Sequence, residues 1–328
     1  MAAKGDDQPL IDISSLPDIS KAEADFHDTS FFQCDPSLPL PQLPTPASLF
    51  QESPDRGYGV IRNERLKLAV KYGSPDDVRL EEAQSMRAIR QAFPHNDVPV
   101  PEVFGWRKQE RRTFIYMSLI GGPTLRQVWS SLTDADKESI CCELSRIVTA
   151  LRRVSQGSSD RFIGKSLRYL HSYAVWDSTL SSLSGSVNGG TVQDRFFKLD
   201  YEEGPFLSIK SFNDWLLAAA TRRRPGPDEV IDGPYRDLLP DTGDIYFTHG
   251  DLTLGNIIVS GIPGSQRIVG IVDWEQAGWY PEYWEYCKAL CGVEYTHEWR
   301  THGWAEKLMK PFDDAWTAYA EYSLWRCP

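Results

Sequence analysis

An aspartate and an asparagine five positions apart could carry phosphoryl-transfer chemistry in this chain of 328 residues. They are Asp251 and Asn256 in the segment HGDLTLGN, which lies between two short apolar stretches. The carboxylate can orient or deprotonate an acceptor hydroxyl, and the amide oxygen can reach a metal ion on nucleotide phosphates. A turn in which both side chains only satisfy backbone groups would explain the same pattern.

A second acidic residue strengthens the catalytic interpretation. Asp273 ends the apolar stretch IVGIVD, seventeen residues after Asn256. Mg²⁺ prefers hard oxygen ligands, so Asp273 and Asn256 are candidate metal ligands. Taken alone, Asp273 could instead cap the turn after an edge strand. Two acidic motifs in one strand–turn–strand frame favour the metal site.

The elements before these motifs predict a small antiparallel lobe. The segment GYGVIRNERLKLAVKYG is typical of a β-hairpin with its turn at Asn63 and Glu64. Apolar residues at helical spacing predict a helix over about 76–92. PVPEVFGWRK and RTFIYMSLI predict two further strands, and GGP then breaks the chain.

The residues after the break predict a larger helical lobe. Thr133 can cap a long amphipathic helix and Ser211 a second one. Three short strands, IYFT, NIIVS and RIVGIV, bracket the motifs. We therefore predict an α+β, bilobal fold with an irregular N-terminal extension (1–45), a β-rich N-lobe (46–120) and a mainly helical C-lobe (121–328).

Composition excludes several classes of protein. Apolar residues make up 41% and charged residues 25%, which rules out wholesale disorder. The net charge of −11 disfavours duplex nucleic acid and anionic membranes as main partners. The chain has no signal-like start, and its six cysteines are sparse. We expect a cytoplasmic protein without a nucleic-acid or membrane partner; the sequence leaves its oligomeric state open.

HGDLTLGN followed by VDWEQAG resembles the aminoglycoside phosphotransferase family, which has a protein-kinase-like fold. FTHGD, GWYPEYWEY and LAVKYG resemble its fungal branch most, and the resemblance covers about residues 58–300. It implies ATP (or GTP), Mg²⁺ and a small-molecule acceptor. Asp251 would be the catalytic residue. His249 would brace the catalytic loop rather than transfer a proton.

The resemblance also implies a nucleotide site in the N-lobe. Lys71, in LAVKYG, stands where the kinase strand lysine holds the α- and β-phosphates. We predict Glu82 as its partner on the following helix, with Glu81 as the alternative, although a solvated helix face would also explain both glutamates. Backbone groups from Met117 to Leu119 would read the adenine edge.

The acceptor site is predicted from the segment that follows Asp273. It is acidic and aromatic, which suits a cationic, amine-bearing acceptor through charge and cation–π attraction. Packing of the aromatic residues is the alternative explanation. The candidate residues are Glu275, Trp279, Tyr280 and Glu282.

One departure from the kinase pattern leaves other functions open. No GxGxxG precedes Lys71, and SPDRGYG (53–59) has only two glycines. The phosphate cover is therefore expected to be either short or supplied by Arg56 and backbone amides. The leading hypothesis is an ATP- and Mg²⁺-dependent small-molecule phosphotransferase. The alternatives are a binding or regulatory pseudoenzyme and a kinase-fold enzyme with other chemistry.

Overall fold

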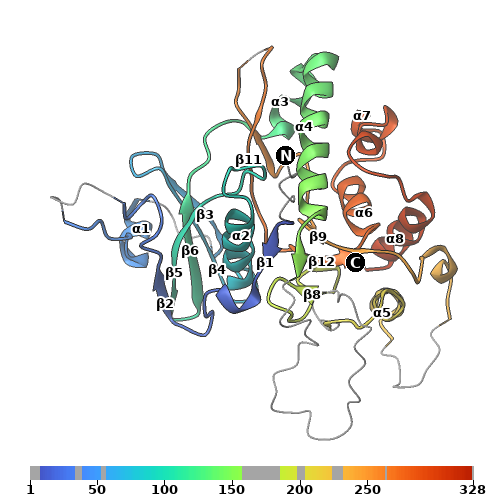
Figure 1. Cartoon of the computed structure of the whole chain (residues 1–328), viewed down its shortest axis with the longest axis horizontal. Helices are drawn as coiled ribbons and strands as arrows, with labels where there is room; N and C mark the ends of the chain where they lie inside the picture. The colour runs from blue at the N-terminus through green and yellow to red at the C-terminus, as the bar shows by residue number, and fades with distance from the viewer. Residues whose placement is uncertain are drawn as a thin grey trace, which may run out of the picture.

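The computed structural model describes residues 8–33, 39–52, 57–156, 185–197, 204–223, 232–262 and 264–326. Strands and one long helix form an N-lobe, shown in blue to cyan in Figure 1, beside a C-lobe shown in green to red. Most of the C-lobe is helical. The predicted bilobal α+β fold is confirmed.

A five-stranded antiparallel sheet forms the N-lobe, in the order β2-β5-β6-β4-β3. The predicted hairpin is present, and Asn63 pairs with Leu68 across its turn. Both faces of the sheet are covered, so the strand that carries Lys71 is apolar on both sides. The strands are β2 (Glu23–Asp25), β3 (Gly59–Asn63), β4 (Leu68–Gly73), β5 (Val103–Gln109) and β6 (Arg112–Ser118).

Helix α2 (Leu80–Ala92) covers one face of this sheet. Its residues Met86 and Ile89 are fully buried in the same apolar cluster as Ile115 of β6. The helix begins four residues later than predicted, because Ser74 and Asp77 form a hydrogen-bonded turn before it. Helix α1 (Pro46–Glu52) contributes to a second apolar cluster, which also includes Val70 of β4.

The predicted N-terminal extension is not separate from the lobes. Strand β2, which lies within it, pairs with β5 at the edge of the N-lobe sheet. Strand β1 (Leu10–Ile11) pairs in parallel with β7 (Ser155–Gln156), directly after helix α4 (Asp134–Arg152) of the C-lobe. The predicted boundary at residue 46 therefore excludes a strand of the sheet.

Side-chain caps fix where the long C-lobe helices begin. Thr133 Oγ1 accepts a hydrogen bond from the Asp136 amide at 3.1 Å, as expected for the cap of α4. Helix α5 (Ile209–Thr221) begins after Ser208, which forms a capping box with Ser211, so the prediction of Ser211 as the cap was wrong by three residues. The other α-helices are α3 (Leu125–Val128), α6 (Trp284–Cys291), α7 (Glu298–Thr301) and α8 (Asp313–Arg326). The 3₁₀ helices are η1 (Ile13–Ser15), η2 (Trp129–Ser131), η3 (Arg195–Phe197), η4 (Arg236–Leu238) and η5 (Ala305–Lys307).

Two small sheets carry the motifs of the C-lobe. One is the antiparallel hairpin of β10 and β11, and the other has the order β8-β12-β9. The chain between the lobes packs directly on β10, where a Cβ added to Gly122 would lie 2.2 Å from the Val259 carbonyl oxygen. Only glycine fits this approach. The strands are β8 (Gly185–Ser186), β9 (Ile245–Thr248), β10 (Ile257–Val259), β11 (Ile268–Ile271) and β12 (Gly278–Pro281).

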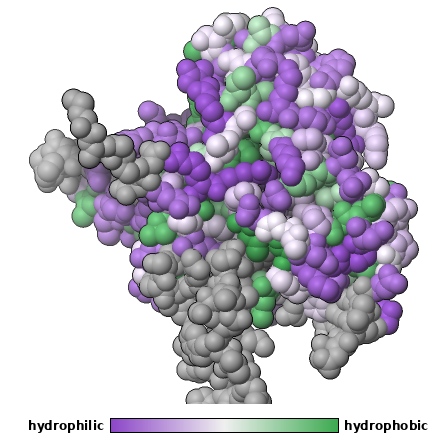
Figure 2. All heavy atoms as spheres, turned by 45° about the vertical axis from the view of Figure 1, so that its right-hand side comes forward, coloured by the Kyte–Doolittle hydropathy of each residue, from purple (hydrophilic) through white to green (hydrophobic). Residues whose placement is uncertain are grey.

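The surface is mainly polar. On the face drawn in Figure 2, hydrophilic residues cover most of the coloured area and hydrophobic residues appear between them in small groups. In the described part of the chain, no helix combines the length and apolar character needed to cross a membrane.

Helix α4 offers a test of the C-lobe core. Leu144 is fully buried in its apolar stripe, whereas Cys142 on the same helix is exposed. We expect Leu144→Ala to lower the free energy of unfolding by about 2–5 kcal/mol, because it leaves a cavity. Cys142→Ala should change it by less than about 0.5 kcal/mol. Chemical denaturation measures both, and equal values would contradict the placement of α4.

Candidate active site

The turn after β9 is held by a buried carboxylate from α6. The backbone amides of His249 and Gly250 donate to Glu285 Oε2 at 2.6 and 3.3 Å. Gly250 has φ +74°, and a Cβ there would lie 2.5 Å from the Gln276 carbonyl oxygen. The glycine and Glu285 together fix the backbone that presents Asp251.

His249 links this turn to the strand end that precedes Asp273. Its Nδ1 accepts a hydrogen bond from the Asp251 amide at 3.1 Å, so its Nε2 must be the atom that donates to the Val272 carbonyl oxygen, also at 3.1 Å. Burial lowers the pKa of His249, which favours this neutral ring. The geometry fits a brace between two motifs.

Asp251 and Asn256 contact each other directly. Asn256 Nδ2 donates to the Asp251 carboxylate at 3.0 Å and to its backbone oxygen at 2.9 Å, which leaves the amide oxygen as the atom available to a metal. The Val272 amide donates to the Asn256 carbonyl at 2.9 Å, so Asn256 lies beside the residue before Asp273. Burial raises the pKa of Asp251 to about 6.

Lys71 contacts three carboxylates at the interface of the lobes. Its Nζ lies 2.8 Å from Glu82, 2.6 Å from Asp273 and 2.9 Å from Glu275. The predicted contact with Glu82 is present, and the helix turns Glu81 elsewhere, to the lining of a cavity at the start of α2. Burial alone would lower the pKa of Lys71, but the three carboxylates raise it above its ordinary value, so the side chain stays charged.

The acidic residues of this cluster fit a divalent cation. Single oxygens of Glu82, Asp273 and Glu275 lie within 4.8 Å of one another, and carboxylate oxygens are suitable ligands for Mg²⁺. Asp273 has φ +66°, a left-handed conformation that is rare for residues with a side chain. Such backbone outliers concentrate at functional sites.

The segment between the lobes differs in detail from the prediction. The Leu119 amide donates to the Lys67 carbonyl at 2.8 Å, and the Ser118 amide donates to Glu102 at 2.8 Å. Met117 is buried in the sheet. Because its amide is already paired within the lobe, Leu119 cannot supply the donor for an adenine edge. The predicted residue Arg56 lies outside the described residues.

The aromatic part of the predicted acceptor site is wrong. The segment GWYP forms β12, the central strand of its sheet, so both aromatic side chains are enclosed. Trp279 is 4% exposed and packs on Phe247, while Tyr280 is fully buried and stacks on Trp284. Packing, the alternative explanation, therefore applies to both.

The two acidic residues of the predicted acceptor site, Glu275 and Glu282, lie in different parts of the C-lobe. Glu282 follows the end of β12 at which Pro281 pairs with Ile245. The turn that carries Asp251 follows Thr248 of β9, which pairs with Gly278 at the opposite end of β12. Glu275 is the one residue of the four that contacts the Lys71 cluster. Its position two residues after Asp273 suits a metal ligand better than a contact for a cationic acceptor.

Two cationic side chains near the site, those of Arg195 and Lys288, were not predicted from the sequence. Arg195 Nε donates to Glu275 Oε1 at 2.8 Å, and its side chain is 59% exposed. Lys288 Nζ is buried between Asp194, at 3.0 Å, and Gln276, at 2.9 Å. Arg195 lies far before the motifs in a polar stretch without periodicity, and Lys288 reads as an ordinary helix residue. The sequence carries no signal that distinguishes either.

A family model matches most of the chain. The phosphotransferase enzyme family (APH) matches residues 57–325, and the chain belongs to this family. The resemblance seen in the motifs is thereby confirmed, while its fungal branch stays a prediction. A search of the curated proteins finds no match.

Solved aminoglycoside phosphotransferases resemble the chain at low sequence identity. APH(3'')-Id from Streptomyces rimosus is 15% identical, with 85% of this chain and 96% of that chain covered and a TM-score of 0.43. APH(2")-IIa in its streptomycin–ATP complex is 12% identical, with 86% and 88% covered and a TM-score of 0.43. The GDP complex of aminoglycoside 2'-phosphotransferase-IIIa is 13% identical, with 85% of each chain covered and a TM-score of 0.43.

The structure predicts that Glu285 supports the turn that carries Asp251. Glu285→Leu leaves two buried amides without an acceptor and should lower the free energy of unfolding by about 2 kcal/mol or more. Glu285→Gln keeps an acceptor oxygen and should cost distinctly less. Denaturation of both variants measures the difference. Equal stability of the two would contradict the role of the paired amides.

Proposed function

We propose that the protein transfers the γ-phosphoryl group of ATP or GTP to a hydroxyl of a small molecule. One observation carries the proposal: the Lys71 ammonium group contacts Glu82 of the N-lobe at 2.8 Å and Asp273 of the C-lobe at 2.6 Å, while Asn256 ties Asp251 to the same strand end. Phosphoryl transfer needs positioning and charge neutralisation more than covalent chemistry from the protein. The arrangement is suited to both.

Lys71 is proposed to hold the α- and β-phosphates. Its charge is secured by three carboxylates, so it can exchange the contacts with Asp273 and Glu275 for phosphate oxygens while Glu82 retains it. The adenine edge would be read by backbone groups after Leu119, because the amides of Ser118 and Leu119 are paired within the lobe.

Asp273, Glu275 and the amide oxygen of Asn256 are proposed to hold Mg²⁺. Bound there, the ion would neutralise charge on the phosphate oxygens. Arg195 already shares Glu275 with Lys71, and it adds positive charge at the exposed rim of the site.

Asp251 is proposed as the base that receives the acceptor proton. The acceptor oxygen forms a bond to the γ-phosphorus, the bond from that phosphorus to the β-γ bridging oxygen breaks, and the proton passes to the Asp251 carboxylate. Asn256 orients this carboxylate through its amide nitrogen. Burial makes Asp251 more basic than an exposed aspartate, which suits the role.

Substitution of Lys71 tests the nucleotide site. Lys71→Met should weaken MgATP binding about tenfold or more, because it removes charge-assisted contacts to phosphate and leaves the carboxylates unneutralised. Lys67→Met, at an exposed lysine in the turn before the same strand, is the matched control. Calorimetric titration measures both. No MgATP binding by the wild type would contradict the proposed function, and MgATP binding without turnover would favour the pseudoenzyme alternative.

The pH dependence of turnover tests Asp251. The carboxylate is the active form, so kcat/KM for the acceptor should be half-maximal near the pKa of about 6, level off at higher pH and fall as the pH decreases below it. Asp251→Asn should reduce kcat about 100-fold or more while MgATP still binds. Asp97→Asn, at an exposed site, is the control. ADP release over a panel of hydroxyl-bearing compounds supplies the acceptor, and activity retained in Asp251→Asn would refute the role.

A further inference from the structure

The N-terminal strap, defined here as residues 9–28, connects the two lobes across α2. At one end, β1 pairs with β7 of the C-lobe, and the Ser155 amide donates to the Pro9 carbonyl at 2.9 Å. At the other end, β2 joins the N-lobe sheet. Figure 1 shows β1 in blue beside α2 at the boundary between the lobes. Because the strap is anchored in both lobes, it can fix the position of α2, which lies between the two anchored ends.

Gln84 of α2 is the residue through which the strap and the C-lobe hold this helix. Its side chain is 4% exposed. Nε2 donates to the Pro17 carbonyl of the strap at 2.8 Å, and Oε1 accepts from Asn188 Nδ2 of the C-lobe at 2.9 Å. The amide nitrogen of Gln84 therefore binds the strap, and its amide oxygen binds the C-lobe.

The geometry of a helix couples Gln84 to Glu82. Two residues apart, they point about 200° away from each other around the axis, so they lie on nearly opposite faces. Glu82 faces Lys71 at 2.8 Å, and Gln84 faces the strap. A rotation or shift of α2 that releases one contact must also move the other.

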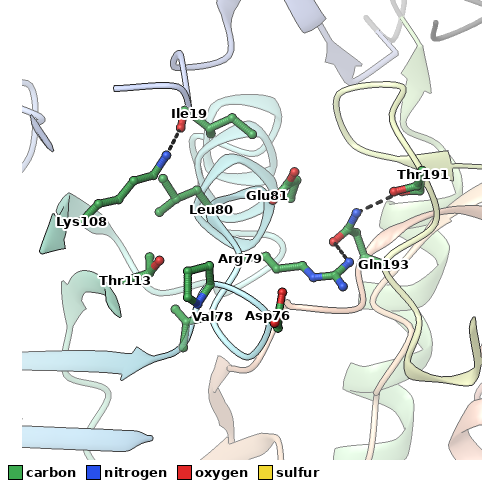
Figure 3. Close-up of a pocket in the computed structure, with 11 residues that line it drawn as sticks. Ile19, Asp76, Val78, Arg79, Leu80, Glu81, Lys108, Thr113, Thr191 and Gln193 are labelled. Carbon is green, nitrogen blue, oxygen red and sulfur yellow. Dashed lines mark hydrogen bonds between the residues drawn. The ribbon is translucent and has the colours of Figure 1, made fainter. Parts of the chain in front are cut away.

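A cavity lies beside the start of α2, although Val78 and Leu80 themselves are buried in the apolar core. A cavity of about 380 Å³ lies between the strap, residues 75–81 and the C-lobe loop at 191–193. Around it, Lys108 Nζ donates to the Ile19 carbonyl at 2.6 Å and Arg79 Nη1 donates to Gln193 at 2.9 Å (Figure 3). With open space beside its first turn, the helix has room to move when these contacts are lost.

The strap also fixes the outer side of α2. Arg87 pairs with Asp28 at 2.9 Å, and its guanidinium carbon lies 3.8 Å from the centre of the Phe26 ring. Ile11 of β1 is 2% exposed and belongs to the same apolar cluster as α2. The helix is thus held from the strap along much of its length.

We propose that the N-terminal strap and Asn188 set the position of α2 through Gln84, and that this position keeps Glu82 against Lys71. Gln84 is a positioning residue, since it acts on the nucleotide site through the helix. The inference rests on the proposed function, because the Lys71–Glu82 pair matters to activity only if Lys71 holds nucleotide phosphates.

The test compares the same substitution at two positions of one helix. Gln84→Met removes both hydrogen bonds at similar volume, and Gln91→Met changes an exposed residue of α2. We expect Gln84→Met to weaken MgATP binding about tenfold and Gln91→Met to leave it unchanged. Equal MgATP affinity of the two variants would overturn the proposal. If Gln84→Met does not fold, Asn188→Ala replaces it, because it removes one of the two bonds.

A double-mutant cycle separates positioning from general destabilisation. If Gln84 acts through Glu82, adding Gln84→Met to Glu82→Gln should cause less than a twofold further loss of MgATP affinity. A full tenfold further loss would show independent effects and overturn the proposal. Ile89→Val, a core substitution in the same helix, controls for lowered stability and should not change MgATP affinity.

A crystal structure of Gln84→Met gives a readout that does not depend on nucleotide binding. The Lys71–Glu82 separation should exceed hydrogen-bond distance in that variant, against 2.8 Å here. An unchanged separation would overturn the proposal. If wild-type protein does not bind MgATP, the proposed function fails, and this structural comparison alone still decides whether Gln84 positions Glu82.

Discussion

The contact of one ammonium group with three carboxylates is the interaction on which the rest of this structure depends. Lys71 comes from the N-lobe sheet, Glu82 from α2, and Asp273 and Glu275 from the segment after β11. Without the cation, three carboxylates at this separation would repel one another in a partly buried place. With it, the site keeps an excess of negative charge, which is a suitable environment for a divalent cation.

Buried polar side chains of the C-lobe fix the backbone on which Asp251 and Asp273 lie. Glu285 accepts hydrogen bonds from the turn that carries Asp251, His249 joins this turn to Val272, and Lys288 is enclosed by Asp194 and Gln276. Each of these side chains has at least one hydrogen-bond partner, as burial of polar groups generally requires, while the second carboxylate oxygen of Glu285, Oε1, is buried without one. The consequence is a rigid platform that presents Asp251 and Asp273 from separate strand ends.

Membership of the phosphotransferase enzyme family and this geometry support each other in different ways. The family model covers residues 57–325 and indicates the class of reaction. The geometry indicates which side chains could perform it, and it removes Trp279 and Tyr280 from consideration because they form a core strand. The strap lies wholly before the matched residues, so the family match does not describe this part of the molecule.

The sequence alone determined those features that depend on neighbours along the chain. The β3–β4 hairpin and the cap of α4 at Thr133 follow from turn residues and capping chemistry. The 100° step of a helix shows that only one of Glu81 and Glu82 can face Lys71. The motifs HGDLTLGN and VDWEQAG also indicated that Asp251 and Asp273 each follow a short apolar strand, and both do. In each case the physical cause acts within a few residues, so the pattern is visible in the sequence.

Tertiary structure decided the features that depend on distant partners. Strands β1 and β8 have two residues each, too few to show periodicity, and β12 is a strand because β9 and β8 pair with its two edges. The same dependence on distant partners explains why the sequence did not reveal Arg195, whose guanidinium group donates to Glu275, 80 positions later in the chain. Only the folded chain brings such groups together, because their contacts are fixed by packing of whole elements and not by local spacing.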